Sequence, residues 1–302
     1  MTNITYFGMA DIPLNFSGHE TFPFRYTWLT KGVQNVNRYA DLFLRDDAIV
    51  ILGVGKNMVH SIRYWCEALD LIESPKRGEF CVTDLGNNLF ATDGWDPFIE
   101  HPATLWLLHW KLASRIEKGT TWFLAFTRWG APTFTKEQLR NWILHLIEEN
   151  NSTRTTQNSL KRDIDVFVRT YVPSRKKTKF LEDSFDCPLV ELGLISEIET
   201  DIYEFTKGSR LSLPDEIFIF ALYEYWQNNY SEQNSVSFEM IMYGAGSPGR
   251  VFGLSENATY ERLVRLPDWT GMSLDITAGM RNVFRNSNVS LSSNVILSRY
   301  YE

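Results

Sequence analysis

The 302-residue sequence has few cysteines, no long apolar segment and no excess of positive charge. Its cysteines, Cys66, Cys81 and Cys187, are widely spaced, and none has a second thiol two residues away. This pattern disfavours a disulfide scaffold or a zinc site and is typical of reduced thiols in a cytoplasm. No apolar run reaches the roughly 20 residues of a membrane-spanning helix, and residues 1–10 lack the pattern of a signal peptide. We therefore expect a cytoplasmic protein with no membrane partner.

The charge is unevenly distributed along the chain. The formal net charge of −7 counts against a nucleic-acid partner, because neutralising phosphates needs a positive surface. However, acidic residues gather in segment 182–204, whereas Lys and Arg far outnumber acids in segment 154–179. The distribution matters more than the sum, so DNA remains a candidate partner.

The first third of the sequence has the element order of a winged helix. Apolar spacing predicts helices over residues 24–36, 46–52 and 56–69, with Gly53-Val54-Gly55 as the turn before the last. Two short strands, 71–73 and 79–83, follow around a Pro-Lys-Arg-Gly turn. In such a unit the long helix lies in the major groove of DNA.

The end of this unit recurs twice. The strings Leu69-Asp70-Leu71-Ile72, Leu192-Gly193-Leu194-Ile195 and Leu263-Val264-Arg265-Leu266 are each followed, eleven positions after the last residue, by a Thr and shortly afterwards by a Gly. We therefore predict a mainly α fold with short β-hairpins (α+β), made of tandem winged-helix or helix-turn-helix-like units over residues 1–95, 96–210 and 211–302. The helices expected in the last two units cover residues 103–118, 135–150, 156–172, 214–226, 237–243 and 256–266.

The glycine turn before the third helix is the first candidate for a DNA contact. It is not the eight-residue loop that holds nucleotide phosphates, which makes ATP an improbable ligand. The turn instead brings Lys56 and Asn57 to the start of the helix, where Asn suits adenine and Lys suits phosphate or guanine. His60 and Arg63 extend this face. A solvated face without a ligand is the alternative.

The densest basic segment is the second candidate. It contains Lys161, Arg162, Arg169, Arg175 and Lys176, and the first three lie on a predicted helix. Such a series can track DNA phosphates, which fixes position without reading sequence. A charged solvent-facing helix followed by a loop is equally compatible with the pattern.

The string Ser17-Gly18-His19-Glu20-Thr21-Phe22-Pro23-Phe24-Arg25 is the third candidate. His19 and Glu20 could serve as acid and base, or with a divalent metal such as Mg²⁺ or Mn²⁺, in phosphodiester cleavage, while Arg25 could contact DNA. Adjacent residues on an extended chain point to opposite sides, so a turn would be needed, and Glu20 could equally cap a helix. The five histidines are scattered, and no metal-ligand cluster is visible.

Three strings together resemble a known bacterial family. They are Phe16-Ser17-Gly18-His19-Glu20-Thr21-Phe22-Pro23, Leu52-Gly53-Val54-Gly55-Lys56-Asn57-Met58-Val59 and Ser159-Leu160-Lys161-Arg162-Asp163-Ile164-Asp165. The family comprises domains encoded beside genes for DNA phosphorothioation, in which sulfur replaces a non-bridging phosphate oxygen as part of defence against phage. The resemblance covers nearly the whole chain. It implies double-stranded DNA as substrate, and a cysteine desulfurase, a PAPS-reductase-like protein and an ATPase as partners.

Three functions follow from these observations. The resemblance implies a nicking component that opens one strand so that sulfur can be installed, but it assigns no catalytic residues. A non-catalytic winged-helix regulator or scaffold that recruits the sulfur-transfer enzymes is the first alternative. The second is an interaction module that docks a partner through the acidic segment 182–204.

Overall fold

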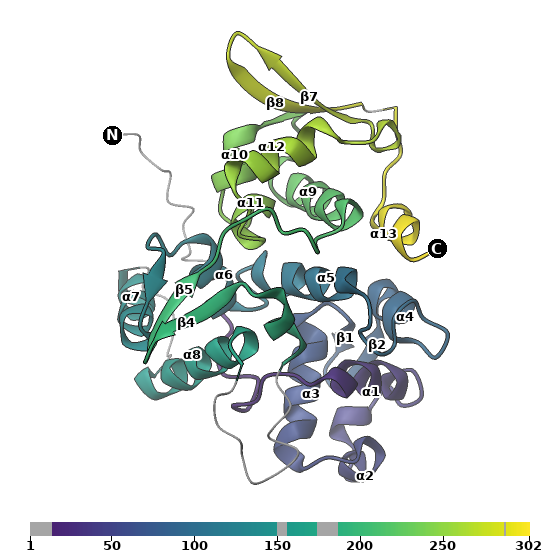
Figure 1. Ribbon diagram of the computed structural model, residues 1–302. Helices are drawn as coiled ribbons and strands as arrows, with labels where there is room; N and C mark the ends of the chain where they lie inside the picture. Colours follow the sequence, from purple (N-terminus) through teal and green to yellow (C-terminus); the bar gives the residue numbers. More distant parts are fainter. Residues whose placement is uncertain (1–13, 150–155, 174–186, 287) are drawn as a thin grey trace.

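The computed structural model describes residues 14–149, 156–173, 187–286 and 288–302 (Figure 1). Helices dominate, and the strands form three small antiparallel sheets, so the predicted α+β class is confirmed. Within the described ranges, no helix has the length and apolar character needed to cross a bilayer.

The first part of the chain has the predicted order of helices and strands. Gly53 ends the second helix in the left-handed region, with φ 64°, and Gly55 caps the next helix in an extended conformation. The two glycines therefore make the sharp turn that the sequence predicts. The elements are α1 (Tyr26–Val36), the 3-10 helix η2 (Leu42–Leu44), α2 (Ala48–Leu52), α3 (Lys56–Ala68), β1 (Ile72–Lys76), β2 (Glu79–Val82) and α4 (Asp84–Phe90).

In the middle part, the helix predicted over 103–118 is present but ends five residues earlier than predicted. The chain forms one helix that ends at Ala113 and a second, unpredicted one that begins at Thr120. Both are apolar on nearly every side, so they lack the amphipathic period that marks helix bounds. The elements are α5 (Pro102–Ala113), α6 (Thr120–Thr127), β3 (Thr133–Phe134), α7 (Lys136–Glu149), α8 (Gln157–Tyr171), η4 (Pro188–Leu192), β4 (Ile195–Glu199) and β5 (Ile202–Phe205).

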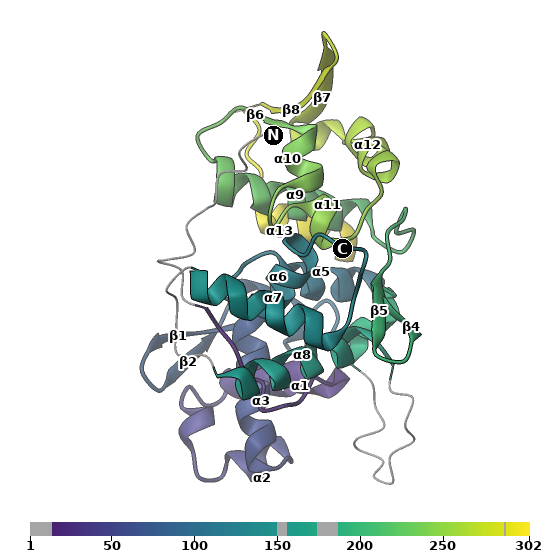
Figure 2. The same cartoon turned by 90° about the vertical axis from the view of Figure 1, so that its left-hand side faces the viewer.

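Capping residues fix the starts of the two long helices in this part. The Thr135 hydroxyl accepts from the Gln138 N–H at 3.1 Å, and the Gln138 side chain accepts from the Thr135 N–H at 2.9 Å. This reciprocal pair is the capping box that the sequence predicts. Thr156 caps α8 through the N–H of Ser159. The two helices, α7 and α8, pack side by side on one face of the molecule (Figure 2).

The last part repeats the sheet topology of the middle part. In both, a short strand before two or more helices pairs with the final strand, giving the orders β3-β5-β4 and β6-β8-β7. The C-terminal helix then returns to pack against α9 (Figure 1). The elements are α9 (Asp215–Tyr230), β6 (Ser235–Ser237), α10 (Phe238–Tyr243), α11 (Pro248–Val251), α12 (Glu256–Val264), the 3-10 helix η5 (Asp268–Thr270), β7 (Met272–Thr277), β8 (Met280–Arg285) and α13 (Ser293–Tyr301).

The predicted hairpin repeat holds for two hairpins and is out of register in the third. Thr83 and Thr206 each follow the second strand, and their N–H groups donate to Leu71 O and Leu194 O. Thr277 instead ends the first strand of its hairpin. The true common feature lies before each hairpin, where one residue has a left-handed backbone. These residues are Asp70 (φ 62°), Gly193 (φ 56°) and Gly271 (φ 63°).

A buried helix and a charge cluster join the three parts. Eleven of the twelve residues of α5 are buried, and α5 contacts α6 and α9. Its Lys111 ammonium lies 2.5 Å from the Glu224 carboxylate on α9 and 3.5 Å from that of Asp70, which follows α3. Arg115 and Lys118 also pair with Asp70. Because Lys111 is almost inaccessible, these contacts are screened little by solvent.

Candidate nucleic-acid interface

The segment before α1 is wedged between α3 and α8. The Ser61 hydroxyl on α3 donates to His19 O at 2.9 Å, and the Trp65 indole donates to Phe22 O at 2.9 Å. Gly18 lies against the ring of Tyr64, where an added Cβ would come within 2.3 Å of the ring, so only glycine allows this approach. Segment 16–23, the first of the family strings, is therefore held in place by α3, the helix whose first residues belong to the second string.

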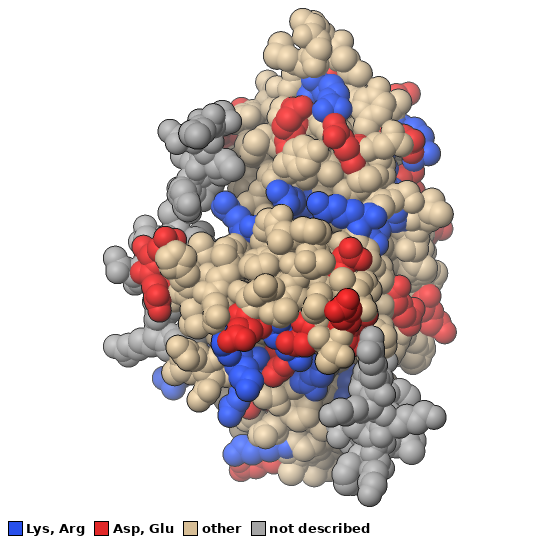
Figure 3. Space-filling view, turned by 60° about the vertical axis from the view of Figure 1, so that its left-hand side comes forward, with Lys and Arg blue, Asp and Glu red and all other residues tan. Residues whose placement is uncertain are grey.

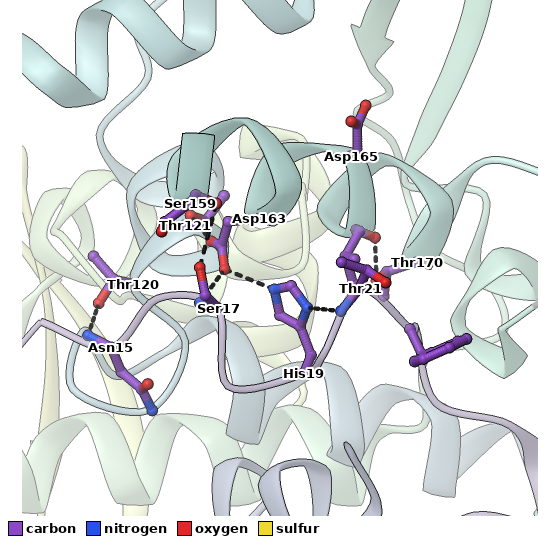
Figure 4. Close-up of polar contacts among 12 residues, drawn as sticks. Asn15, Ser17, His19, Thr21, Thr120, Thr121, Ser159, Asp163, Asp165 and Thr170 are labelled. Carbon is purple, nitrogen blue, oxygen red and sulfur yellow. Dashed lines mark hydrogen bonds and ion pairs between the residues drawn. The ribbon is translucent and has the colours of Figure 1, made fainter. Parts of the chain in front are cut away.

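A buried histidine and aspartate connect this segment to α8 (Figure 4). His19 Nδ1 accepts from the Thr21 N–H at 3.2 Å, so the proton on Nε2 is directed at Asp163 Oδ1, 2.7 Å away. The same carboxylate accepts from the Ser17 N–H at 2.8 Å and from the Thr121 hydroxyl. Both His19 and Asp163 are fully buried. This network fixes the Ser17–Thr21 turn against α8.

The turn has a strained backbone. Ser17, Glu20 and Thr21 all have positive φ, at 67°, 48° and 68°. Non-glycine residues rarely adopt this region, and a cluster of them persists only where the surrounding contacts hold them. The strain brings the Thr21 carbonyl to the surface of α8, where it accepts a hydrogen bond from the Arg169 guanidinium.

Beside this contact lies a basic hollow of about 250 Å³. Its lining residues are Thr21, Lys136, Arg162, Asp165 and Arg169. The Lys136 ammonium lies 2.8 Å from the Asp165 carboxylate. Burial lowers the pKa of Lys136, but the hydrogen bond and charge of Asp165 outweigh it, and the pKa is raised above its ordinary value. Three cations and one carboxylate thus surround a space that suits an oxyanion such as a phosphate.

Figure 3 views this side of the molecule. Lys and Arg side chains gather in two places, a lower group interleaved with acidic side chains and a band below the C-terminal part of the chain. This face thus carries two groups of basic side chains even though the net charge of the chain is −7.

The second candidate surface is the start of α3. Lys56 and Asn57 occupy its first two positions and are exposed, as the glycine turn predicts, and His60 is partly exposed one turn later. Arg63 is partly exposed, and its Nε lies 3.8 Å from the Glu67 carboxylate. These residues form one continuous edge of the helix.

The other predicted residues are dispersed. Glu20 is exposed, whereas its neighbour His19 is buried in the core, so the structure does not bring the two side chains together at the surface. Arg25 caps α1, with its guanidinium 5.3 Å from the centre of the Trp28 ring. Lys161 is exposed on α8. Arg175 and Lys176 lie outside the described residues. The catalytic roles of His19 and Glu20 remain predictions.

Divalent metal ions are bound in proteins by characteristic sets of ligands. In the described ranges, no three or more His, Cys, Asp or Glu side chains are grouped as metal ligands. The carboxylate nearest the basic hollow, Asp165, is engaged by Lys136.

Sequence reasoning missed Asp163 and Lys136 as parts of this region. Leu160, Ile164 and Phe167 form the apolar face of α8, and Asp163 lies on that same face. A carboxylate at a core position needs donors, and that is the signal that could have revealed its buried partners. Lys136 gave no such signal, because a lysine in a first helical turn is unremarkable in sequence.

Fold and surface together define an α+β protein with repeated helix–hairpin units and a basic hollow on one face. The chain belongs to the DUF4007 family, described as proteins of unknown function, whose model matches residues 16–301. No curated protein matches it. Two crystal structures of SspB, one with a bound magnesium ion, are similar, each with 30% identity and a TM-score of 0.86 over 97% of this chain and 90% of the other. The chain is thus SspB-like, which confirms the phosphorothioation-associated resemblance predicted from the sequence.

Proposed function

We propose that this chain is the DNA-binding component of a phosphorothioate modification system active in anti-phage defence. The observation that carries the proposal is the basic hollow on α8, with Lys136, Arg162 and Arg169 around a space suited to a phosphate. The similarity to SspB supports the system to which it belongs. The edge of α3 with Lys56, Asn57 and His60 would supply the contacts to bases. Lys161, Arg25 and Arg63 would flank these surfaces.

We also propose that the units over residues 1–95, 96–210 and 211–302 are winged-helix domains. In the last two units the support is the repeated strand order, in which the strand before the helices pairs with the last strand of the hairpin, and in the first unit it is the order of helices followed by the β1-β2 hairpin. In this arrangement α3, α8 and α12 hold the position of the recognition helix.

Removing the two arginines of the hollow should weaken binding to duplex DNA by tenfold or more. We expect the double variant Arg162→Ala/Arg169→Ala to lose about two units from the slope of log K against log salt, since each phosphate contact contributes about one. Fluorescence anisotropy with a labelled duplex at several salt concentrations measures both the affinity and its salt dependence. Arg38→Ala/Arg299→Ala, which removes two exposed arginines outside α3, α8 and α12, is the matched control. Equal losses in the two variants would refute the phosphate site.

Strand nicking is the further activity we propose, so that sulfur can be incorporated at the opened strand. Glu20 is exposed and precedes Thr21, which lines the hollow, and we assign it the role of taking a proton from an attacking water. His19 is buried and would act by holding the Ser17–Thr21 turn. One SspB structure contains magnesium, so Mg²⁺ and Mn²⁺ are the ions to test. A cysteine desulfurase, a PAPS-reductase-like protein and an ATPase are the proposed partners.

Glu20→Gln should abolish conversion of supercoiled plasmid to open circle while leaving the affinity for DNA within about twofold. Gel electrophoresis after incubation with and without Mg²⁺ or Mn²⁺ checks this, and Glu197→Gln on β4 serves as a carboxylate control. If the wild type binds DNA but never nicks it, a non-catalytic regulator or scaffold is the correct function.

A further inference from the structure

A second cavity lies between the middle and last parts of the chain. It has a volume of about 280 Å³ and is formed by the segment after α6, the end of β5, and helices α10 and α11. A short parallel bridge between Gly208 and Leu254 holds the two parts together next to it. The volume lies just below the roughly 300–1,000 Å³ of small-molecule sites, so the cavity has room for one small group only.

Aromatic rings held by their own contacts form the walls. The Trp129 indole donates to Thr133 O at 3.2 Å, and its ring meets that of Trp142 edge-on at 5.3 Å. Phe205 packs edge-on against Phe126, with 5.4 Å between ring centres. Tyr243 is exposed at the rim. Rings that are fixed before a ligand arrives offer stacking surfaces at little entropic cost.

Positive charge surrounds the same cavity. Lys207 and Arg250 are among its lining residues; Lys207 is exposed and Arg250 is partly so. Arg210 does not line the cavity, but its guanidinium donates to the hydroxyl of the lining residue Thr206 at 3.0 Å and its Nε donates to Phe252 O at 3.0 Å, and burial lowers its pKa to about 10. In Figure 3 a band of Lys and Arg side chains crosses the face below the last part of the chain, where these elements meet.

We propose that this cavity binds one unstacked nucleotide of a DNA strand. The base would stack on Trp129 and Phe205, and its phosphate would pair with Lys207 and Arg250. Proteins that act on a nucleotide outside the double helix read it by aromatic stacking in a pocket of this kind. The inference deepens the proposed DNA-binding function and rests on it. A base inside an intact duplex is stacked on both faces and cannot enter.

Gly130 allows the cavity to be filled without removing any native atom. It lines the cavity and is exposed, and an added Cβ would meet no atom within 4 Å. Gly130→Trp should weaken binding of a short oligothymidylate by about tenfold or more and leave binding of a blunt duplex unchanged. Gly130→Ala, which fills little of the space, is the matched control. Fluorescence anisotropy with both DNA probes, on the full chain, makes the comparison.

The exposed Lys207 offers a second variant that does not disturb folding. Lys207→Glu should weaken oligothymidylate binding several-fold while the thermal midpoint stays unchanged. Unchanged single-strand binding in both Gly130→Trp and Lys207→Glu would overturn the inference, as would an equal loss for both probes. If the wild type binds oligothymidylate but no duplex, the proposed duplex-binding function fails and the cavity site stands. If it binds duplex but no oligothymidylate, the reverse holds.

Discussion

Replacing Asp163 by alanine should lower the free energy of unfolding by about 3–5 kcal/mol, because a buried partner of several donors is lost. The carboxylate accepts from the Ser17 N–H, the His19 imidazole and the Thr121 hydroxyl. The His19 and Thr121 donors would remain in the interior, without water to replace the lost acceptor. Urea unfolding followed by tryptophan fluorescence measures the change.

The control for this variant lies two residues further along the same helix. Asp165 is 42% exposed and pairs with Lys136, which is 35% exposed. Its replacement by alanine should cost less than about 1 kcal/mol, since exposed ion pairs contribute little. Similar losses for the two aspartates would contradict the role assigned to the buried network. Limited proteolysis of the Asp163→Ala protein should also cut within residues 14–25, because the turn loses its anchor.

Acidification from about pH 7.5 to about pH 5 should remove about 2 kcal/mol of stability through His109 alone. This residue of α5 is fully buried, with Tyr171 Oη 2.8 Å from Nδ1 and Val251 O 2.7 Å from Nε2. Burial lowers its pKa from 6.5 to about 3, although the hydrogen bond to Val251 opposes the shift. Below pH 6.5, His109 therefore binds a proton in the unfolded chain but stays neutral in the folded chain. The stability that depends on neutral His109 is therefore fully present above pH 6.5, and it is lost progressively as the pH falls towards 3.

His109→Gln isolates this effect, because a glutamine amide can offer one acceptor and one donor in the same positions but does not titrate. The variant should be less stable than the wild type at about pH 7.5, and its stability should fall less steeply towards about pH 5. Urea unfolding at several pH values gives the two curves. Parallel curves would mean that His109 takes up its proton equally in the folded and unfolded states.

Local signals in the sequence were sufficient for much of the fold. The glycine turn before α3 and the Thr135–Gln138 capping box depend on residues within one helical turn, and the structure has both. The split between α5 and α6 was not predictable in the same way. Their sequences are apolar around the whole helix because tertiary neighbours cover every side, and that is a property of the assembled core.

The candidate site was predicted only in part, for a related reason. Arg162 and Arg169 were evident as exposed cations on an amphipathic helix. The contact between His19 and Asp163 joins residues 144 positions apart, and nothing local distinguishes that aspartate from the solvent-facing Asp165. The third hairpin shows the same limit. Thr277 was matched to Thr83 by its spacing in the sequence, but the geometry that the three hairpins share is the left-handed residue before each of them.

Asp70 is the left-handed residue of the first hairpin, where its two counterparts are glycines. A side chain at such a position strains the backbone by about 1–2 kcal/mol. The same side chain receives Lys111, Arg115 and Lys118 from the middle of the chain. Transplanted without those cations, the first unit would keep its strain and lose the ion pairs that offset it. The first unit therefore cannot be transferred to another protein on its own. A chimera built by exchanging units must include α5 and the segment that follows it together with the first hairpin.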